Sequence, residues 1–353
     1  MTDADVLIAG AGPVGLATAL YLADAGLSVV VADPRSGPDS APIDKACGEG
    51  LLPAALRSLA ELGVDPSGQP LRGIGYRDGR RSVDAEFRAG PGRGVRRVEL
   101  QAALCSAVEK RGIPIVPVAV KAVSQDDRTV SAAGFRVRYL VGADGLHSAV
   151  RRAVGLQPTA ASGPRSASGS GLARWGQRRH YPVAPWTDLV EVHWASSAEA
   201  YVTPVADGLV GVAVLSSVRE PFDQQMQAFP ELADRLSGVA GTPVLGAGPL
   251  RQSVPGRVAG RVLLVGDAAG YVDALTGEGI SVGLQSAWAL AGCLRVDRPG
   301  DYEKAWRQAS RRYRVMTESL LFAASRPWLR RRIVPAAAAM PPLFGAIVNQ
   351  LSL

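Results

Sequence analysis

The sequence is poor in cysteine and histidine. Its three cysteines, Cys47, Cys105 and Cys293, lie far apart, and the chain has only three histidines. This excludes a disulfide framework and leaves no spaced set of metal ligands, so we expect no bound metal and a reducing compartment. Long apolar runs are absent as well, and the first residues include Asp3 and Asp5 instead of the basic start of a signal peptide. We therefore expect a cytoplasmic protein.

Lysine is also scarce, with 39 basic residues that are nearly all arginine, and the net charge is +7. The arginines are spread along the chain and are densest only near the C-terminus, so nucleic acid is not an expected partner. An anionic cofactor is an alternative explanation of the excess charge. The length of 353 residues and the apolar content of 47% are enough for a sizeable core and favour two domains. The oligomeric state cannot be predicted from these numbers.

The most informative stretch comes first. An apolar strand at 6–9 runs into Gly10-Ala11-Gly12-Pro13-Val14-Gly15, followed by a helix at 16–25 and a second strand that ends at Asp33. In such a β-α-β unit the glycines allow a tight turn and a close approach of the backbone to a pyrophosphate at the helix N-terminus. Asp33 is placed to accept a hydrogen bond from a ribose hydroxyl. The pattern predicts dinucleotide binding.

Four later segments have a similar character. Lys45-Ala46-Cys47-Gly48-Glu49-Gly50 precedes a predicted helix at 54–62 and offers backbone amides to an anion, although a plain structural loop would look alike. Asp144-Gly145 and Gly266-Asp267 each end an apolar strand, where α/β sheets hold ligands. Gly277-Glu278-Gly279 opens a helix that extends to 294 and presents its amides beside Asp267.

The rest of the chain alternates between sheet and helix signals. Residues 113–120 read as a strand, and 123–137 as a hairpin that leads into a strand at 139–141. Residues 71–97 and 165–250 predict antiparallel strands that form a substrate domain. The nucleotide-binding domain would then consist of 1–70, 98–164 and 251–300. Residues 301–353 form a helical, Arg-rich C-terminal segment that either covers the substrate cavity or rests on a membrane surface.

The order of Gly10-x-Gly12-x-x-Gly15, Asp144-Gly145 and Gly266-Asp267 resembles the flavoprotein monooxygenases of the para-hydroxybenzoate hydroxylase fold and the related geranylgeranyl reductases. The resemblance implies an α/β fold with a Rossmann-like FAD-binding domain of the GR2 type, an inserted antiparallel β-sheet domain and a C-terminal helical tail. It also implies FAD as cofactor and NAD(P)H as transient reductant. The FAD-binding residues that it implies are Gly10, Gly12, Pro13, Gly15, Asp33, Arg35, Cys47, Arg97, Val120, Asp144, Gly145, Asp267, Gly277, Gly279 and Ile280.

Fewer residues indicate whether the chain is more similar to the reductases or to the monooxygenases of this group. Lys45-x-Cys47-Gly48-x-Gly50 and 275–280 are similar to geranylgeranyl reductase signatures, but the aromatic substrate motif of those reductases is reduced to Tyr201 and Pro204. The whole pattern is most similar to small oxidoreductases of polyketide phenolic-lipid pathways. That likeness implies a monooxygenase that uses dioxygen to hydroxylate an apolar aromatic or lipid-like phenol.

Two alternatives stay open from the sequence. One is a flavin-dependent reductase of a double bond in a prenyl or other unsaturated lipid, with Cys47 as the candidate catalytic residue. The other is a non-catalytic flavin-carrying protein that binds an apolar ligand. The candidates for the substrate pocket are Trp194, Tyr201, Thr203 and Pro204.

Overall fold

The first strand, β1 (Ala4–Ala9), lies inside the largest sheet of the computed structural model, which describes residues 2–37, 42–157 and 173–352. Its two neighbours both run parallel to it, so that Ile8 is opposite Val31 on one side and Val141 on the other. The path of this eight-stranded sheet is β17 (Val258–Ala259), β18 (Val262–Leu264), β11 (Phe135–Gly142), β1, β2 (Val29–Ala32) and β8 (Ile115–Val116), with β9 (Val123–Gln125) and β10 (Val130–Ala132) paired beyond β11.

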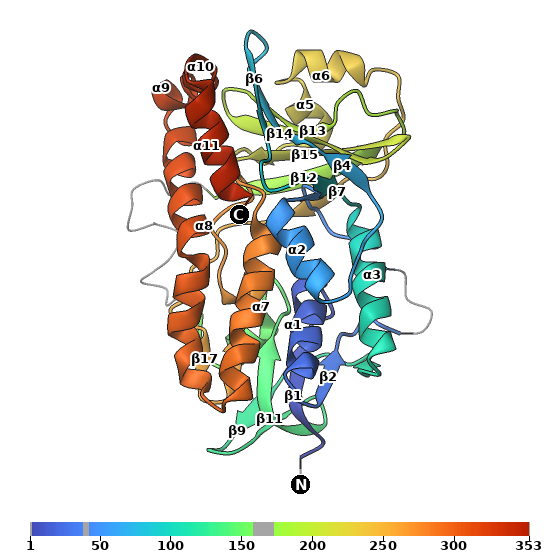
Figure 1. Ribbon diagram of the computed structural model, residues 1–353, viewed down its shortest axis with the longest axis vertical. Coiled ribbons are helices and arrows are strands. Elements are labelled where there is room, and N and C mark those ends of the chain that lie inside the picture. Colours follow the sequence, from blue (N-terminus) through green and yellow to red (C-terminus); the bar gives the residue numbers. More distant parts are fainter. Residues whose placement is uncertain (1, 38–41, 158–172, 353) are drawn as a thin grey trace.

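Helices pack closely on this sheet because small residues occupy the contacts. Helix α1 (Pro13–Asp24) packs against α3 (Arg97–Lys110) and α7 (Gly279–Arg295) (Figure 1). A methyl group at Gly283 of α7 would lie 2.4 Å from a side-chain carbon of Val14, and one at Gly15 would lie 2.0 Å from the carbonyl oxygen of Gly10. These glycines therefore set the distance between the turn, the strand and the two helices.

The strand predicted at 113–120 is shorter than expected. Only Ile115–Val116 pairs with β2. Pro114 and Pro117 flank the pair, and neither has a backbone N–H to give to a ladder. The apolar run continues to Val120, which is buried without being part of the sheet.

A second sheet of seven strands lies at the opposite end of the molecule from the N-terminus (Figure 1). Its order is β16 (Leu245–Ala247), β12 (Trp175–Tyr181), β15 (Leu209–Ser216), β14 (Ala198–Ala206), β13 (Leu189–Trp194), β5 (Gly73–Arg77) and β6 (Ser82–Glu86). All of its pairs are antiparallel except β13 with β5. The early segment 73–86 thus joins strands that come more than a hundred residues later. The predicted domain boundary between residues 164 and 165 lies outside the described residues.

Short elements connect these layers. A three-stranded sheet consists of β3 (Gly50–Leu51), β7 (Gly92–Gly94) and β4 (Gln69–Leu71), and it lies beside α2 (Pro53–Glu61). In the described part of the chain, the remaining short helices are α4 (Ala149–Ala153), α5 (Phe222–Met226) and α6 (Pro230–Arg235), together with two 3-10 turns, Gly266–Ala269 and Pro299–Asp301.

The chain ends in four helices, as predicted for residues 301–353. They are α8 (Tyr302–Ala324), α9 (Pro327–Arg330), α10 (Ile333–Ala339) and α11 (Pro341–Leu351). Helix α8 packs along α7, while α10 and α11 lie against β6 at the far end (Figure 1). Asn349 of α11 secures this contact, because its amide donates to Glu86 O at 2.9 Å and accepts from Arg88 N at 2.6 Å.

Within the described residues, no helix taken singly has the length and apolar character that a membrane crossing needs. One sharply bent pair, Pro327–Ala339 with Pro341–Leu351, meets that test on length and composition, with 105° between its two parts.

Candidate functional site

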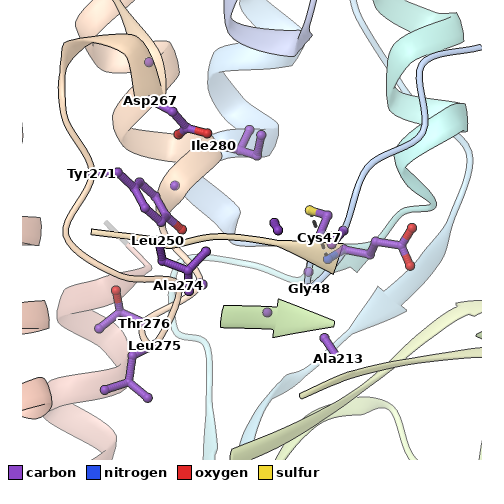
Figure 2. A pocket seen from close by; sticks show the side chains of 18 of the residues that line it. Cys47, Gly48, Ala213, Leu250, Asp267, Tyr271, Ala274, Leu275, Thr276 and Ile280 are labelled. Carbon is purple, nitrogen blue, oxygen red and sulfur yellow. Dashed lines mark hydrogen bonds between the residues drawn. The ribbon is translucent and has the colours of Figure 1, made fainter. Parts of the chain in front are cut away.

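A cavity of about 1000 Å³ runs from the glycine turn after β1 to the C-terminal helices. Segments from both ends of the molecule line it, among them the turn at residues 10–14, the loop 45–52, residues 143–149, the turn at 265–280, the second sheet, and α8, α10 and α11. Figure 2 shows its middle part, where Cys47, Asp267, Tyr271 and Ile280 surround one hollow.

The sequence-predicted cofactor residues gather along this cavity. Those that line it are Gly10, Gly12, Pro13, Asp33, Arg35, Cys47, Arg97, Val120, Asp144, Gly145, Asp267, Gly277, Gly279 and Ile280. Gly15 lies behind the turn, where it allows the close packing described above. Residues from seven separate stretches of sequence therefore meet at one site.

The glycine turn leaves room for an anion. A methyl group on Gly12 would meet only the Arg97 guanidinium, at 3.8 Å, so the space above this residue is open. Helix α1 begins here without any capping side chain, which leaves its first amides without side-chain acceptors. Arg97 Nε is buried and has no hydrogen-bond partner within the described part of the chain. A pyrophosphate fits between the amides and this cation.

Asp33 lies at the end of β2 with its carboxylate already held. It accepts hydrogen bonds from Ala11 N at 2.9 Å and from Arg35 N at 2.9 Å, and the Arg35 guanidinium pairs with it at 3.1 Å. Burial raises the pKa of this carboxyl, but the bonds from Arg35 and Ala11 outweigh burial, and the net shift is downward. The group is therefore an ionised acceptor, as a ribose hydroxyl requires.

Cys47 faces the cavity from the loop between β2 and α2. Its sulfur accepts a hydrogen bond from Glu49 N at 3.4 Å. Burial raises the pKa of the Cys47 thiol, and the nearby Arg97 only partly offsets this. The group is consequently a neutral thiol at neutral pH, which makes it a proton donor and a poor nucleophile.

The loop that carries Cys47 rests on a buried polar network that the sequence did not indicate. Glu49 has a backbone φ of 60° and accepts hydrogen bonds from Arg97 N at 2.9 Å and from His180 Nε2 at 2.6 Å. Arg178 donates to His180 Nδ1 at 2.9 Å and pairs with Asp44 at the start of the loop. Strand β12 thereby fixes both ends of the loop.

The opposite wall is built by the turn after β18. Burial raises the pKa of the Asp267 carboxyl, and the cations Lys45 and Arg97 offset part of the effect. Tyr271, which sequence reasoning missed, packs against Gly279, where an added methyl group would lie 3.5 Å from the phenol oxygen. The Tyr271 hydroxyl has no hydrogen-bond partner among the described residues and lies in the cavity (Figure 2).

The far half of the cavity is apolar. Tyr201 lines it and donates from its hydroxyl to Leu275 O at 2.7 Å. The other three residues predicted for the pocket do not line it. Thr203 lies under the Cys47 loop and donates to Gly48 O at 2.8 Å, and the Pro204 carbonyl packs against Gly94. Trp194 is covered by Tyr76, with ring centroids 5.4 Å apart, and by Arg330.

Four buried charges connect the C-terminal helices to this wall. Glu199 of β14 pairs with Arg174 and, at 2.6 Å, with Arg330 of α9. Arg174 also pairs at 3.2 Å with Asp273, whose pKa burial raises to about 6. Arg330 donates as well to Ala198 O at 2.6 Å. Because the two acids balance the two cations, the cluster holds α9 to the sheet without a net buried charge.

Comparison with known proteins agrees with this geometry. A family model described as an FAD binding domain matches residues 3–173. The chain is 32% identical over 340 residues to a menaquinone reductase of Mycolicibacterium smegmatis, with 86% of this chain and 80% of that protein covered. It is 25% identical over 343 residues to digeranylgeranylglycerophospholipid reductase 2 of Methanosphaera stadtmanae, with 86% and 81% covered.

The solved structures show the same fold. The halogenase PltM in complex with phloroglucinol and FAD superposes with a TM-score of 0.74 at 16% identity, covering 97% of this chain and 82% of that one. At this identity the likeness concerns the fold alone. The matching family model and the open anion site beside Gly12 identify FAD as the cofactor.

Proposed function

Because this chain belongs to the family of FAD-dependent oxidoreductases that includes the menaquinone reductase of M. smegmatis, we propose that it reduces a carbon–carbon double bond in an apolar, lipid-like substrate. The observation that carries the proposal is the position of Cys47, which lines the cavity across from Tyr271 and Asp267 (Figure 2) and whose thiol pKa burial raises. NAD(P)H is the proposed source of electrons.

The chemistry needs one hydride and one proton. FAD, when bound and reduced, supplies the hydride to one carbon of the double bond. The Cys47 thiol donates its proton to the other carbon and recovers one from water, so the substrate gains two hydrogens in total. Glu49 and His180 hold the loop that carries the thiol, and Gly277 and Gly279, which line the cavity, would face the cofactor's ring system.

The shape of the cavity supports a substrate with a long apolar part. Beyond Tyr201 its walls come from Leu215, Leu250 and Leu275 and then from α8, α10 and α11. An extended hydrocarbon chain buried there gains roughly 0.8 kcal/mol per CH₂. The reactive end then lies near Cys47 and the apolar end lies among the C-terminal helices.

Hydroxylation of an apolar phenol with dioxygen, the reaction that the sequence favours, is the second candidate. The apolar cavity supports it equally, because an alkylated phenol has the same shape as an isoprenoid quinone. The two reactions differ in what the Cys47 thiol must do, since oxygen transfer to an electron-rich ring needs no thiol proton donor.

The deciding experiment uses the FAD-loaded protein with NADPH, ¹⁸O-labelled dioxygen, and either prenylated quinones or alkylresorcinols. Reduction yields a product heavier by two hydrogens and free of label, whereas one labelled oxygen in the product refutes reduction and establishes hydroxylation. If none of the ligands promotes reduction and reoxidation of the flavin, the protein binds an apolar ligand without catalysing a reaction.

A matched pair of cysteine variants tests the role of the thiol. Cys47→Ala is expected to keep FAD bound and reducible by NADPH while product formation falls by about 100-fold. Cys105→Ala on α3, whose side chain lies outside the cavity, should leave turnover unchanged. Full activity in Cys47→Ala would remove the proton-donor role.

A further inference from the structure

Apolar side chains are exposed on the outer side of the C-terminal helices. Val315 of α8 and Met340, Leu343 and Ile347 at α11 line the cavity and are nevertheless exposed, Leu343 to 52%. Residues that both line a cavity and reach solvent mark its mouth. The cavity therefore has an opening at this surface, where these four apolar side chains form most of the rim and the exposed Ser319 of α8 adds a hydroxyl.

Helix α11 is apolar on two faces. Phe344, Val348 and Leu351 are buried against the protein, while Leu343 and Ile347, one turn apart, are exposed. An exposed apolar stripe of this kind normally has a partner. None of the described residues of the chain covers it.

The adjoining helix α9 carries the features of a membrane interface. Trp328 is 65% exposed, and Arg331 and Arg332 follow it in exposed positions with no acidic partner in the described part of the chain. No Asp or Glu occurs from Ser319 to the end of the sequence. Arg330 alone is neutralised, by Glu199. Tryptophan, apolar side chains and unpaired arginines together match the boundary between headgroups and acyl chains of an anionic bilayer.

We propose that Trp328, Arg331, Arg332, Met340, Leu343 and Ile347 form a docking face that binds the surface of an anionic lipid bilayer. Docking places the mouth of the cavity against the acyl region, so a lipid-like ligand enters without crossing water. The helices lie on the membrane and do not cross it, because α11 buries its inner face in the protein and the chain bends by 105° between Pro327–Ala339 and α11. The inference is independent of which reaction the site performs.

Vesicle flotation with the FAD-loaded protein tests the proposal. Vesicles of phosphatidylglycerol and phosphatidylcholine should carry the protein upward in the gradient, and vesicles of phosphatidylcholine alone should bind it at least about tenfold less. High salt should weaken the binding to anionic vesicles. Absence of flotation at low salt with anionic vesicles would overturn the proposal.

Charge-reversed variants locate the face. Arg331→Glu with Arg332→Glu should weaken binding by more than about tenfold, because each arginine contributes roughly a factor of five at an anionic surface. Lys110→Glu with Arg128→Glu makes the same change in net charge at exposed positions on α3 and on the turn between β9 and β10. If both double variants lose the same amount of vesicle binding, the binding depends only on the net charge of the protein, and the docking face would be rejected.

Tryptophan variants separate a membrane from a second copy of the chain. Trp328→Ser should reduce flotation several-fold, and Trp288→Ser on α7, where the indole is equally exposed, should not. Both proteins are also examined by analytical ultracentrifugation without lipid. If Trp328→Ser turns an oligomer into a monomer and leaves flotation intact, the face joins copies of the chain and the proposal is wrong.

Discussion

His180 Nε2 donates a hydrogen bond of 2.6 Å to the Glu49 carboxylate, although 131 positions separate the two residues in the chain. The direction follows from Arg178, which can only donate and which occupies His180 Nδ1 at 2.9 Å. The imidazole proton must then lie on Nε2. A strand of the second sheet thus controls the loop that presents Cys47 to the cavity.

Loss of this imidazole should destabilise the protein. His180→Ala leaves the Glu49 carboxylate buried with one donor fewer, and we expect the free energy of unfolding to fall by about 3 kcal/mol. His180→Gln keeps an N–H donor at a similar position and should recover part of the loss. Urea denaturation of the FAD-loaded proteins measures both. Equal midpoints for His180→Ala and the native protein would show that the network does not hold the loop.

The two glycines of the first turn should respond differently to the same methyl group. At Gly12 the methyl meets only Arg97, at 3.8 Å, whereas at Gly15 it would lie 2.0 Å from a backbone oxygen. Gly12→Ala is therefore expected to fold normally without FAD but to bind FAD at least about tenfold more weakly, because the methyl occupies the pyrophosphate site. Gly15→Ala should lower the stability of the FAD-free protein itself. Calorimetric titration with FAD and denaturation of the apoprotein distinguish the two effects.

The sequence could predict those parts of the site that a short stretch of chain builds. The glycine turn, Asp33, Asp144-Gly145 and Gly266-Asp267 each follow a buried strand, and parallel strands deliver their carboxyl ends to one edge. Alternation and turn signals likewise indicated the second sheet. Local patterns were sufficient because the geometry they encode is local.

Features that depend on distant pairings could not be predicted. In the sequence, Arg330 does not differ from the other arginines of the C-terminal segment, and only the fold places it beside Glu199. Nothing near Tyr271 in the sequence indicates that its hydroxyl lies in the cavity. The alternating pattern of its strand predicts that Trp194 faces the substrate pocket, yet Tyr76 and Arg330 cover its ring. Such burial is decided by elements that the strand's own sequence does not contain.

Glu278 should make stability depend on pH. Burial raises the pKa of this carboxyl to about 7 from 4.5, against smaller opposing effects of Arg312 and Thr276. The folded state then holds a proton that the unfolded state has lost, so stability falls as pH rises from about 4.5 to about 7 and stays constant above that. Glu278→Gln removes this loss, and in the FAD-free protein its benefit should be about 2–3 kcal/mol larger at pH 8 than at pH 4. Denaturation at the two pH values measures the difference, and the same benefit at both would contradict the raised pKa.

Two tyrosines of the cavity differ in whether their hydroxyls are engaged, and this difference makes the last prediction. The Tyr201 hydroxyl is bonded to Leu275 O at 2.7 Å, whereas the Tyr271 hydroxyl has no partner in the described part of the chain. Tyr201→Phe should therefore cost about 1 kcal/mol of stability, because it leaves a buried carbonyl without its donor. Tyr271→Phe should leave stability and FAD affinity unchanged.

The effect of Tyr271→Phe on turnover then reports on the substrate alone. A free hydroxyl beside the Gly279 wall is positioned to bond a polar group of the bound ligand, and its loss should lower kcat/KM by about tenfold. Steady-state kinetics with the substrate identified by product mass provide the measurement, and the bound-flavin absorbance confirms that the cofactor is retained. Unchanged kcat/KM in Tyr271→Phe would mean that the substrate does not reach this hydroxyl and would contradict its role in substrate binding.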